Sequence, residues 1–304
     1  MKTRVLVLGG TGMLGSMVTT VLAREPRVEL TVSVRDTAFA DRFAPHLPGV
    51  RWLPFEARDD ELGPSLDLSG RPEWVINAIG ITKPLINEDD PVKVRRAIRI
   101  NAMFPHRLAQ WAEERGARLL QIATDCVFGG VKRGYLETHP HDALDVYGKT
   151  KSLGEVKSTT VHHLRCSVIG PEPKDFKFLV EWLRRQPKNA RVNGFVNQEW
   201  NGITTLHFAR ICRGIIAQGI KLPHLQHVVP SGSTTKAELL RMIAAAYGRS
   251  DLQIVDAHAP QTVINVLDTQ DRELNEALWR AAGYDAPPTL GAAIVEMSRQ
   301  EPLV

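Results

Sequence analysis

The sequence predicts an α/β protein built on a Rossmann-type, doubly wound parallel sheet, with a smaller, mostly helical C-terminal lobe. Short apolar runs alternate with helical segments over the first half of the chain, as in successive βαβ units. A glycine-rich turn follows the first apolar run, at the place where such folds bind phosphate. We therefore expect a nucleotide-binding domain over 1–170. We expect a substrate-binding lobe over 171–304, discontinuous and with some segments returning to the sheet.

The expected strands are short runs rich in Val, Ile and Leu. The run at 5–8 is continuously apolar, as in a strand buried on both faces, whereas apolar and polar residues alternate at 28–34. Further strands are expected at 74–78, 118–123 and 163–169. Helices are expected at 14–22, 91–100, 102–115, 146–157, 175–185, 204–219, 235–247, 270–282 and 288–299. Thr235 and Glu238 form a capping box for one of them.

The composition is that of an ordinary globular protein. Of 304 residues, 43% are hydrophobic and 24% charged, and no apolar run approaches the length of a membrane span. The N-terminus runs straight into a strand pattern, so we expect no signal peptide. Three widely spaced cysteines, Cys126, Cys166 and Cys212, fit a reducing compartment. A cytoplasmic protein without membrane contact is expected.

The charge balance favours small anionic ligands over nucleic acid. The net charge is +4 and the pI is about 9.0, but Lys and Arg are scattered, whereas nucleic-acid binding needs a concentrated basic stripe. The arginine pairs at 95–96 and 184–185 are interpreted as solvated helix faces. His139 and His141 lack a third ligand nearby in sequence, so no metal site is expected.

The glycine turn has the spacing Gly-x-x-Gly-x-x-Gly. Gly9 permits a tight turn, Gly12 lets the backbone approach a pyrophosphate, and Gly15 lets the following helix pack against the strand. The helix N-terminus offers N–H groups and a positive dipole end to phosphates. A plain tight turn without ligand is the alternative. The expected dinucleotide contacts are Gly9, Thr11, Gly12, Met13, Leu14 and Gly15.

The end of the second strand indicates which dinucleotide is preferred. An acidic residue at the end of this strand binds the ribose hydroxyls of NAD, and an arginine at the same place accommodates the 2′-phosphate of NADP. Arg35 comes first and Asp36 follows. NADP(H) is therefore favoured, and Asp36 keeps NAD(H) as an alternative. Arg35 can also be read as a solvated charge at a strand end.

Tyr147 and Lys151 stand four residues apart, so on a helix they share one face. A Lys one turn away stabilises the phenolate and lowers the pKa of the Tyr, which can then transfer a proton in a redox step. Such Tyr–Lys pairs are common on amphipathic helices. The glycine turn upstream is the feature that indicates a catalytic role for this pair. Thr124 ends the preceding strand, where its hydroxyl could bond a substrate carbonyl; a β-branched residue closing a strand is the alternative.

Together these residues resemble the extended short-chain dehydrogenase/reductase superfamily, and most closely the dTDP-4-dehydrorhamnose reductase family, whose members reduce 4-keto nucleotide sugars. The resemblance is carried by the glycine turn at 9–15, Thr124-Asp125-x-Val127-Phe128, Tyr147-x-x-x-Lys151 and Arg165-x-Ser167. It is specific through about residue 170. Beyond that, Gly202-Ile203-Thr204-Thr205 stands where the family has Gly-x-Pro-Thr, and Cys126 replaces the family's usual Tyr. These departures leave the exact sugar open.

The resemblance implies a role for each matching position. Tyr147 donates a proton to the carbonyl oxygen, Lys151 lowers the Tyr pKa and binds the nicotinamide ribose, and Thr124 orients the carbonyl. Asn101 matches the helix Asn that anchors a proton-relay water; its other interpretation is a polar residue that interrupts a helix. The implied cofactor-lining residues are Asn77, Ala78 and Gly80, with Glu56 near the adenine. The implied substrate-side residues are Asp125, Val127, Phe128, Trp200, Asn201 and Thr204.

The expected activity is NADPH-dependent reduction of a 4-keto deoxy nucleotide-diphosphate sugar, in activated-sugar or polysaccharide biosynthesis, by a chain that can form a homodimer. A nucleotide-sugar epimerase would use the same Tyr, Lys and Thr but keeps NAD bound, which Arg35 weakly disfavours. A 4,6-dehydratase needs an Asp-Glu pair after the Thr, and Cys126 stands at the Glu position. A non-catalytic NADP-binding regulatory subunit is the further alternative. Trp200 is equally well explained as a packed surface residue.

Overall fold

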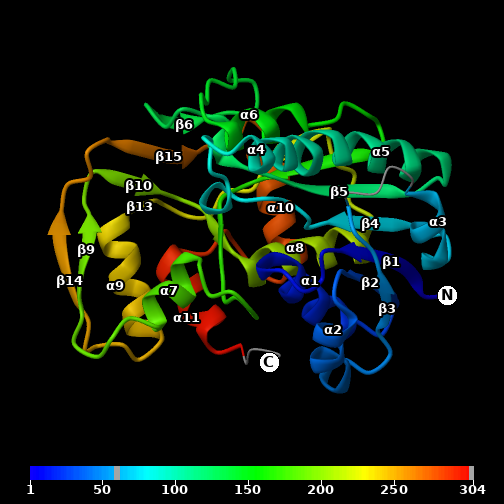
Figure 1. Ribbon diagram of the computed structural model, residues 1–304, viewed down its shortest axis with the longest axis horizontal. Helices are drawn as coiled ribbons and strands as arrows, with labels where there is room; N and C mark the ends of the chain where they lie inside the picture. Colours follow the sequence, from blue (N-terminus) through cyan, green and yellow to red (C-terminus); the bar gives the residue numbers. More distant parts are fainter. Residues whose placement is uncertain (58–61, 301–304) are drawn as a thin grey trace.

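The computed structural model describes residues 1–57 and 62–300. Its centre is a seven-stranded sheet in the order β12-β7-β5-β4-β1-β2-β3, with every neighbouring pair parallel (Figure 1). Its strands are β1 (Thr3–Leu8), β2 (Val28–Val34), β3 (Arg51–Pro54), β4 (Trp74–Asn77), β5 (Arg118–Ala123), β7 (Val161–Arg165) and β12 (Leu225–His227). The predicted doubly wound α/β fold is confirmed.

Helices cover both faces of this sheet (Figure 1). One layer consists of α4 (Pro91–Ala97), α5 (Phe104–Glu114) and α6 (Val146–Leu153), and the other of α1 (Met13–Ala23), α8 (Thr205–Gln218) and α10 (Arg272–Ala282). The short helices α2 (Thr37–Phe43) and α3 (Gly63–Leu66) follow strands near the N-terminal edge. The predicted helices at 91–100 and 102–115 are joined through a π-helical turn, Ile98–Met103.

The division of the chain between sheet and lobe is not a single cut near residue 170. Helix α8, strand β12 and helix α10 lie in the second half of the chain but complete the central sheet and its helical layer. Strand β6 (Arg133–Tyr135), from the first half, pairs instead with the lobe strand β15 (Val263–Leu267). Segments from each half of the chain therefore contribute both to the layers around the central sheet and to the lobe.

The lobe contains strands as well as helices. A four-stranded sheet has the order β13-β10-β15-β6, and two-stranded pairs join β14 to β9 and β11 to β8. The remaining lobe strands are β8 (Val168–Ile169), β9 (Arg191–Phe195), β10 (Gln198–Trp200), β11 (Ile203–Thr204), β13 (Thr234–Thr235) and β14 (Gln253–Ala257). The lobe helices are α7 (Leu179–Arg184), α9 (Lys236–Ala246) and α11 (Leu290–Ser298). Thr235 caps α9 by accepting from the Glu238 N–H, as its capping pattern indicates.

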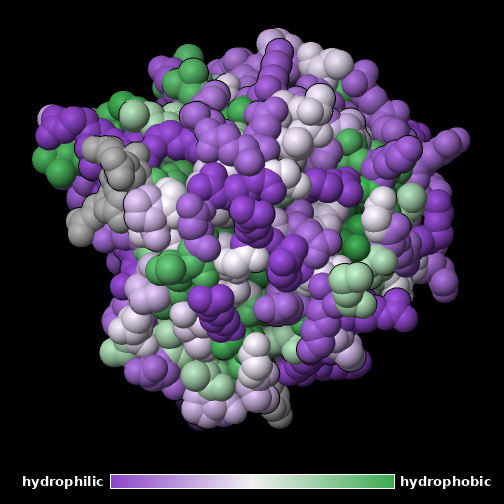
Figure 2. Space-filling view, turned by 90° about the vertical axis from the view of Figure 1, so that its right-hand side faces the viewer, coloured by the Kyte–Doolittle hydropathy of each residue, from purple (hydrophilic) through white to green (hydrophobic). Residues whose placement is uncertain are grey.

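The end of the molecule that carries the N-terminus has a mainly hydrophilic surface, on which apolar patches are small and separated (Figure 2). Within residues 1–57 and 62–300, no helix is long and apolar enough to cross a membrane. The apolar side chains instead gather on the two faces of the central sheet.

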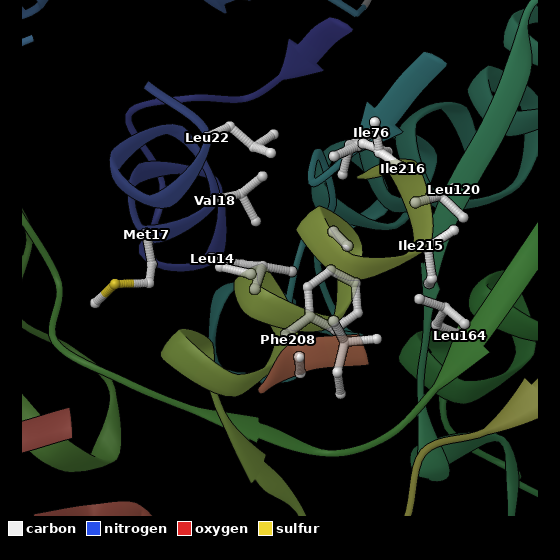
Figure 3. Packing of buried hydrophobic residues seen from close by; sticks show 14 of the residues in the cluster. Leu14, Met17, Val18, Leu22, Ile76, Leu120, Leu164, Phe208, Ile215 and Ile216 are labelled. Carbon is white, nitrogen blue, oxygen red and sulfur yellow. The ribbon is translucent and has the colours of Figure 1, made fainter. Parts of the chain in front are cut away.

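One of these apolar clusters lies between the sheet and the layer of α1, α8 and α10 (Figure 3). Leu14, Val18 and Leu22 of α1 face Phe208 and Ile215 of α8 across it (Figure 3). Their spacing of about one helical turn explains why the amphipathic pattern of α1 was readable in the sequence. The close packing of α8 onto α1 fixes the helix that follows the glycine turn.

Candidate active site

The glycine turn has a separate steric reason for each glycine. Gly9 has φ +83°, and a Cβ there would come within 2.9 Å of the Ile79 side chain. A Cβ on Gly15 would lie 2.1 Å from the Gly9 carbonyl oxygen, so α1 can approach the turn only without a side chain. At Gly12 the nearest atom would be 3.5 Å away, which leaves the position open. No side chain caps α1 at Gly12, so its N-terminus can receive an anion.

A cleft of about 730 Å³ opens beside this turn. It lies at the carboxyl ends of β1, β2 and β4 and is bounded on one side by α4. Parallel sheets place their ligands at this edge. Of the predicted cofactor contacts, those that line the cleft are Gly9, Thr11, Gly12, Arg35, Ala78 and Gly80. Those not among its lining residues are Met13, Leu14, Gly15, Asn77, Tyr147 and Lys151.

The cleft is strongly basic. Its basic lining residues are Arg35, Lys93, Arg95, Arg96, Arg99 and Lys174, and among the described residues that line it only Glu56 is acidic. The pair at 95–96, interpreted from the sequence as a solvated face, therefore faces the cleft. Asp36, the acid that would favour NAD(H), caps α2 by accepting from the Ala38 N–H at 3.0 Å. Lys174 comes from the lobe half of the chain and had no signal in the sequence.

Two buried asparagines hold the loop that forms one wall of the cleft. Asn77 donates to the Gln121 side chain at 2.8 Å and accepts from the Ile79 N–H at 3.0 Å. Asn101, inside the π-helical turn, exchanges two hydrogen bonds of 2.8 Å with the backbone of Ile81. Both amides therefore position the loop, and Asn77, which was expected to line the cleft, is directed at Gln121 and the Ile79 backbone. Local π-helical turns occur often at functional sites.

Helix α6 is fixed against the same loop. Asp145 caps it by accepting from the Gly148 N–H at 2.8 Å and forms an ion pair of 2.8 Å with Lys83. Gly148 lies against the turn after β5, where a Cβ would come within 2.4 Å of the Cys126 carbonyl oxygen. The glycine between Tyr147 and Lys151 is thus required for this approach. The close contact brings Tyr147 to the carboxyl end of β5, where Thr124 lies.

Thr124, Tyr147 and Lys151 meet at the end of β5. The Lys151 ammonium donates to the carbonyl oxygen of Ile122 at 2.9 Å. The Thr124 hydroxyl donates to Asp125 Oδ1 at 3.2 Å and lies near the Tyr147 phenol. Three of the four residues predicted to be catalytic therefore lie together near the loop that lines the basic cleft, and the fourth, Asn101, is bonded to the backbone of that loop.

The pKa of Tyr147 is raised above its ordinary value, and not lowered as expected. Burial is the largest cause and the Cys126 thiol the second, while the Thr124 side chain acts in the opposite direction. Lys151 is not among the main causes, because its ammonium is directed at the Ile122 carbonyl. Burial lowers the pKa of Lys151 itself to about 8. Tyr147 is therefore fully protonated at neutral pH.

A buried ion pair fixes the chain just after α6. Arg165 is fully buried and donates to both carboxylate oxygens of Glu155, at 2.7 and 2.6 Å. Its guanidinium also contacts His141 Nε2 at 2.8 Å. His139 Nδ1 accepts from the Leu136 N–H. Both histidines of the preceding loop therefore have structural partners.

Several residues predicted to bind substrate are already used by the fold. Val127 and Phe128 are buried, and Phe128 stacks on Tyr135 with ring centroids 4.4 Å apart. The Asn201 amide exchanges hydrogen bonds of 2.7 and 2.9 Å with the backbone of Leu267. Thr204 caps α8. These four side chains have structural roles in the folded chain.

The other two predicted substrate residues differ from these. Asp125 is buried, and its Oδ2 makes no hydrogen bond within the described residues. Burial raises the pKa of this carboxyl group. Trp200 is half-buried on β10, and a Cβ on Gly202 would meet its ring at 2.2 Å. Asp125 therefore has spare hydrogen-bonding capacity beside Thr124, and Trp200 packs against its own loop.

Known proteins resemble this chain in sequence and in fold. The chain is 34% identical over 155 residues to a dTDP-4-dehydrorhamnose reductase of Streptomyces griseus, a match that covers 51% of this chain and 44% of that relative. The chain thus spans less than half the length of that curated relative.

Solved structures share the fold over nearly the whole chain. A dTDP-4-dehydrorhamnose reductase of Bacillus anthracis in complex with NADP has a TM-score of 0.70 at 17% identity, covering 98% of this chain and 99% of that one. A Bordetella bronchiseptica enzyme in complex with NAD and UDP has a TM-score of 0.73 at 19% identity, covering 98% and 94%. The family model described as RmlD substrate binding domain matches residues 3–301, and the chain therefore belongs to this family.

Proposed function

We propose that this chain uses NADPH to reduce the 4-keto group of a deoxy nucleotide-diphosphate sugar. The observation that carries the proposal is the placement of α6, which sets Tyr147 and Lys151 beside Thr124 at the end of β5, while Asn101 links α6 to the loop that lines the basic cleft. The names of the matched relatives support this activity. The product would serve the biosynthesis of activated sugars or polysaccharides.

The cleft fits a phosphate-rich dinucleotide. Position 12 leaves room for a pyrophosphate, the N-cap residue Gly12 offers α1 no side-chain cap, and the charged residues described in the lining are basic apart from Glu56. Arg35 would contact the 2′-phosphate of NADP(H), since Asp36 is already engaged in capping α2. The B. anthracis relative was solved with NADP and the B. bronchiseptica enzyme with NAD, so NAD(H) is the second choice.

The chain's own residues would supply the proton and the orientation. When bound, a reduced nicotinamide supplies the hydride that the ketone carbon accepts. Tyr147 donates its phenolic proton to the carbonyl oxygen, so that the C=O bond becomes C–H and O–H, and the phenolate recovers a proton from solvent. Tyr147 is protonated at neutral pH, as this direction of reaction needs, although its raised pKa makes it a weaker acid than an exposed tyrosine. Thr124 and Asp125 would orient the sugar, and Lys151 the ribose.

The test is a turnover assay that follows NADPH absorbance with 4-keto-6-deoxy nucleotide sugars. We expect ketone-dependent oxidation of NADPH and a 4-hydroxy sugar product. Conversion of a 4-hydroxy sugar into its epimer without net NADPH consumption would indicate an epimerase. Absence of turnover with every ketone, together with NADP binding, would indicate a regulatory subunit.

We further propose that two copies associate through the faces of α4–α5 and α6. Apolar side chains exposed there and in the turns beside them are Ile98, Met103, Leu144 and Leu153. Exposed apolar side chains on adjacent helices favour a self-complementary contact. Light scattering of wild type and Leu153→Lys tests this, and equal masses would contradict it. Three free cysteines and a reduced cofactor favour a cytoplasmic location.

A further inference from the structure

One side chain of the lobe half reaches the cofactor cleft. Lys174 lies in the segment 170–178, which joins β8 to α7, and it lines the cleft together with Arg35. Its ammonium lies 4.6 Å from the ring centre of Phe39 on α2. In Figure 1 the chain before α7 runs from the lobe toward α1 and α2. This segment therefore crosses from the substrate side of the molecule to the end of β2.

Local contacts hold the segment 170–178 in this position. The buried Glu172 carboxylate accepts a hydrogen bond from the Phe178 N–H across the loop. Asp175 and Phe176 adopt φ of 67° and 50°, a left-handed conformation that non-glycine residues seldom take. The Arg185 guanidinium lies 3.4 Å from the Phe176 ring centre and holds the turn down. A turn with two such residues persists only where its surroundings determine it.

Two positive charges are thereby held near each other, and neither forms an ion pair within the described residues. Among the residues that the structure describes, neither Arg35 nor Lys174 has a carboxylate at ion-pair distance. Burial and the nearby charge of Arg35 lower the pKa of Lys174, and they outweigh the smaller opposing effects of the Asp175 and Asp36 carboxylates. Asp36, which could neutralise them, is directed at the N-terminus of α2. Such an arrangement is stabilised by an anion of high charge density.

We propose that Lys174 and Arg35 together bind the 2′-phosphate of NADP(H), so that a residue from the substrate side of the chain takes part in choosing the cofactor. This rests on the proposed use of a nicotinamide dinucleotide. The guanidinium offers a planar fork and the ammonium a compact charge, and a phosphate dianion can bind both. NAD(H) lacks this group and gains nothing from Lys174.

The test measures binding and does not depend on turnover. Titration calorimetry compares NADP⁺ with NAD⁺, and 2′,5′-ADP with 5′-AMP, on the full chain. Lys174→Ala should weaken NADP⁺ and 2′,5′-ADP by about tenfold to a hundredfold. NAD⁺ and 5′-AMP should change by less than about twofold. Lys174→Arg should retain most of the preference.

Lys177→Ala is the matched control, because Lys177 is exposed on the same segment and does not line the cleft. It should bind all four ligands like wild type. Equal losses of affinity for NADP⁺ and NAD⁺ in Lys174→Ala would mean that the residue only shapes the cleft. That result would overturn the inference. A wild-type preference for NADP⁺ that Lys174→Ala leaves unchanged overturns this inference alone. A wild-type chain that binds neither dinucleotide overturns the proposed function as well.

Discussion

The two ends of the proposed site differ in what their side chains do in the folded chain. At the cofactor end, Arg35 and Lys174 line the cleft without an ion-pair partner among the described residues. At the substrate end, Asn201 and Thr204 have their polar atoms bonded to the protein. Side chains that bind a ligand have an unpaired charge or an unused hydrogen-bonding group in the free protein. Side chains whose polar groups are already bonded to the protein stabilise the fold. A predicted site residue is therefore a good candidate for ligand binding where its polar atoms still lack a hydrogen-bond or ion-pair partner in the folded chain.

Tyr147 lies between the cofactor end and the substrate end of the proposed site. Its replacement should lower turnover more than any other substitution. Tyr147→Phe removes the proton donor, so turnover should fall by about 10²–10⁴-fold. NADP⁺ affinity measured by calorimetry should stay close to wild type. The control is Tyr247→Phe, a half-buried lobe tyrosine whose hydroxyl has no hydrogen bond among the described residues. A near-normal rate for Tyr147→Phe would falsify the proposed acid.

Arg35→Asp tests the cofactor end next. The change replaces a cation in the cleft by an anion, which repels a 2′-phosphate and can bond ribose hydroxyls. The ratio of kcat/KM for NADPH over NADH should fall by about tenfold to a hundredfold. Arg27→Asp makes the same charge change on an exposed residue outside the cleft, and should leave the ratio unaltered. An unchanged ratio in Arg35→Asp contradicts the assignment.

The sequence carries more local signal for the cofactor end than for the substrate end, for a physical reason. The glycine turn is contiguous, and its function depends on backbone geometry that glycine spacing reveals. Tyr147 and Lys151 are one helical turn apart, so their proximity is also local. Lys174 and Arg35 are far apart in sequence and meet only through tertiary folding. No periodicity or motif marks such a pair.

Details that depend on side-chain direction were also beyond the sequence. The expected effect of Lys151 on the Tyr147 pKa assumed that the ammonium faces the phenol, but it is directed at the Ile122 carbonyl. Asn77 was expected to line the cleft and instead bonds Gln121 and the backbone. The strands of the lobe are short, and tertiary pairing stabilises them more than local propensity does. The mixed lobe was for this reason described as mostly helical.

The buried ammonium of Lys151 also lowers the free energy of unfolding of the chain. Its pKa of about 8, against an ordinary 10.5, means that the unfolded chain binds its proton more readily. The penalty is full below about pH 8 and fades as the pH rises toward 10.5. Lys151→Met should raise the free energy of unfolding at neutral pH by at most about 3 kcal/mol, while turnover is lost.

Urea unfolding at several pH values checks this prediction. The stability difference between Lys151→Met and wild type should shrink with rising pH. Lys149→Met, on an exposed position of the same helix, should show no such trend. A Lys151→Met variant that is less stable than wild type at every pH would mean that the hydrogen bond to Ile122 outweighs the burial of the charge.

Two glycines separate the folding role of the turn from its binding role. Gly15→Ala places a methyl group 2.1 Å from the Gly9 carbonyl oxygen and should destabilise the chain by about 1–3 kcal/mol. Gly12→Ala meets nothing closer than 3.5 Å and should unfold like wild type but bind NADP⁺ more weakly. Thermal unfolding and calorimetry measure the two effects. Equal stability of both variants would contradict the packing role given to Gly15.

Asn201→Ala should give the smallest effect on catalysis and so tests the contrast from the substrate end. Its amide joins β10 to β15 through two hydrogen bonds with Leu267, so its loss should cost about 1–3 kcal/mol of folding free energy. KM for the sugar should change by less than about threefold, since both the oxygen and the nitrogen of this buried amide are already bonded to the backbone of Leu267. Asn193→Ala, at an exposed lobe position, controls for the substitution. A large rise in KM with unchanged stability would show that an engaged side chain can still exchange its partner for substrate, and the distinction between the two ends would no longer hold.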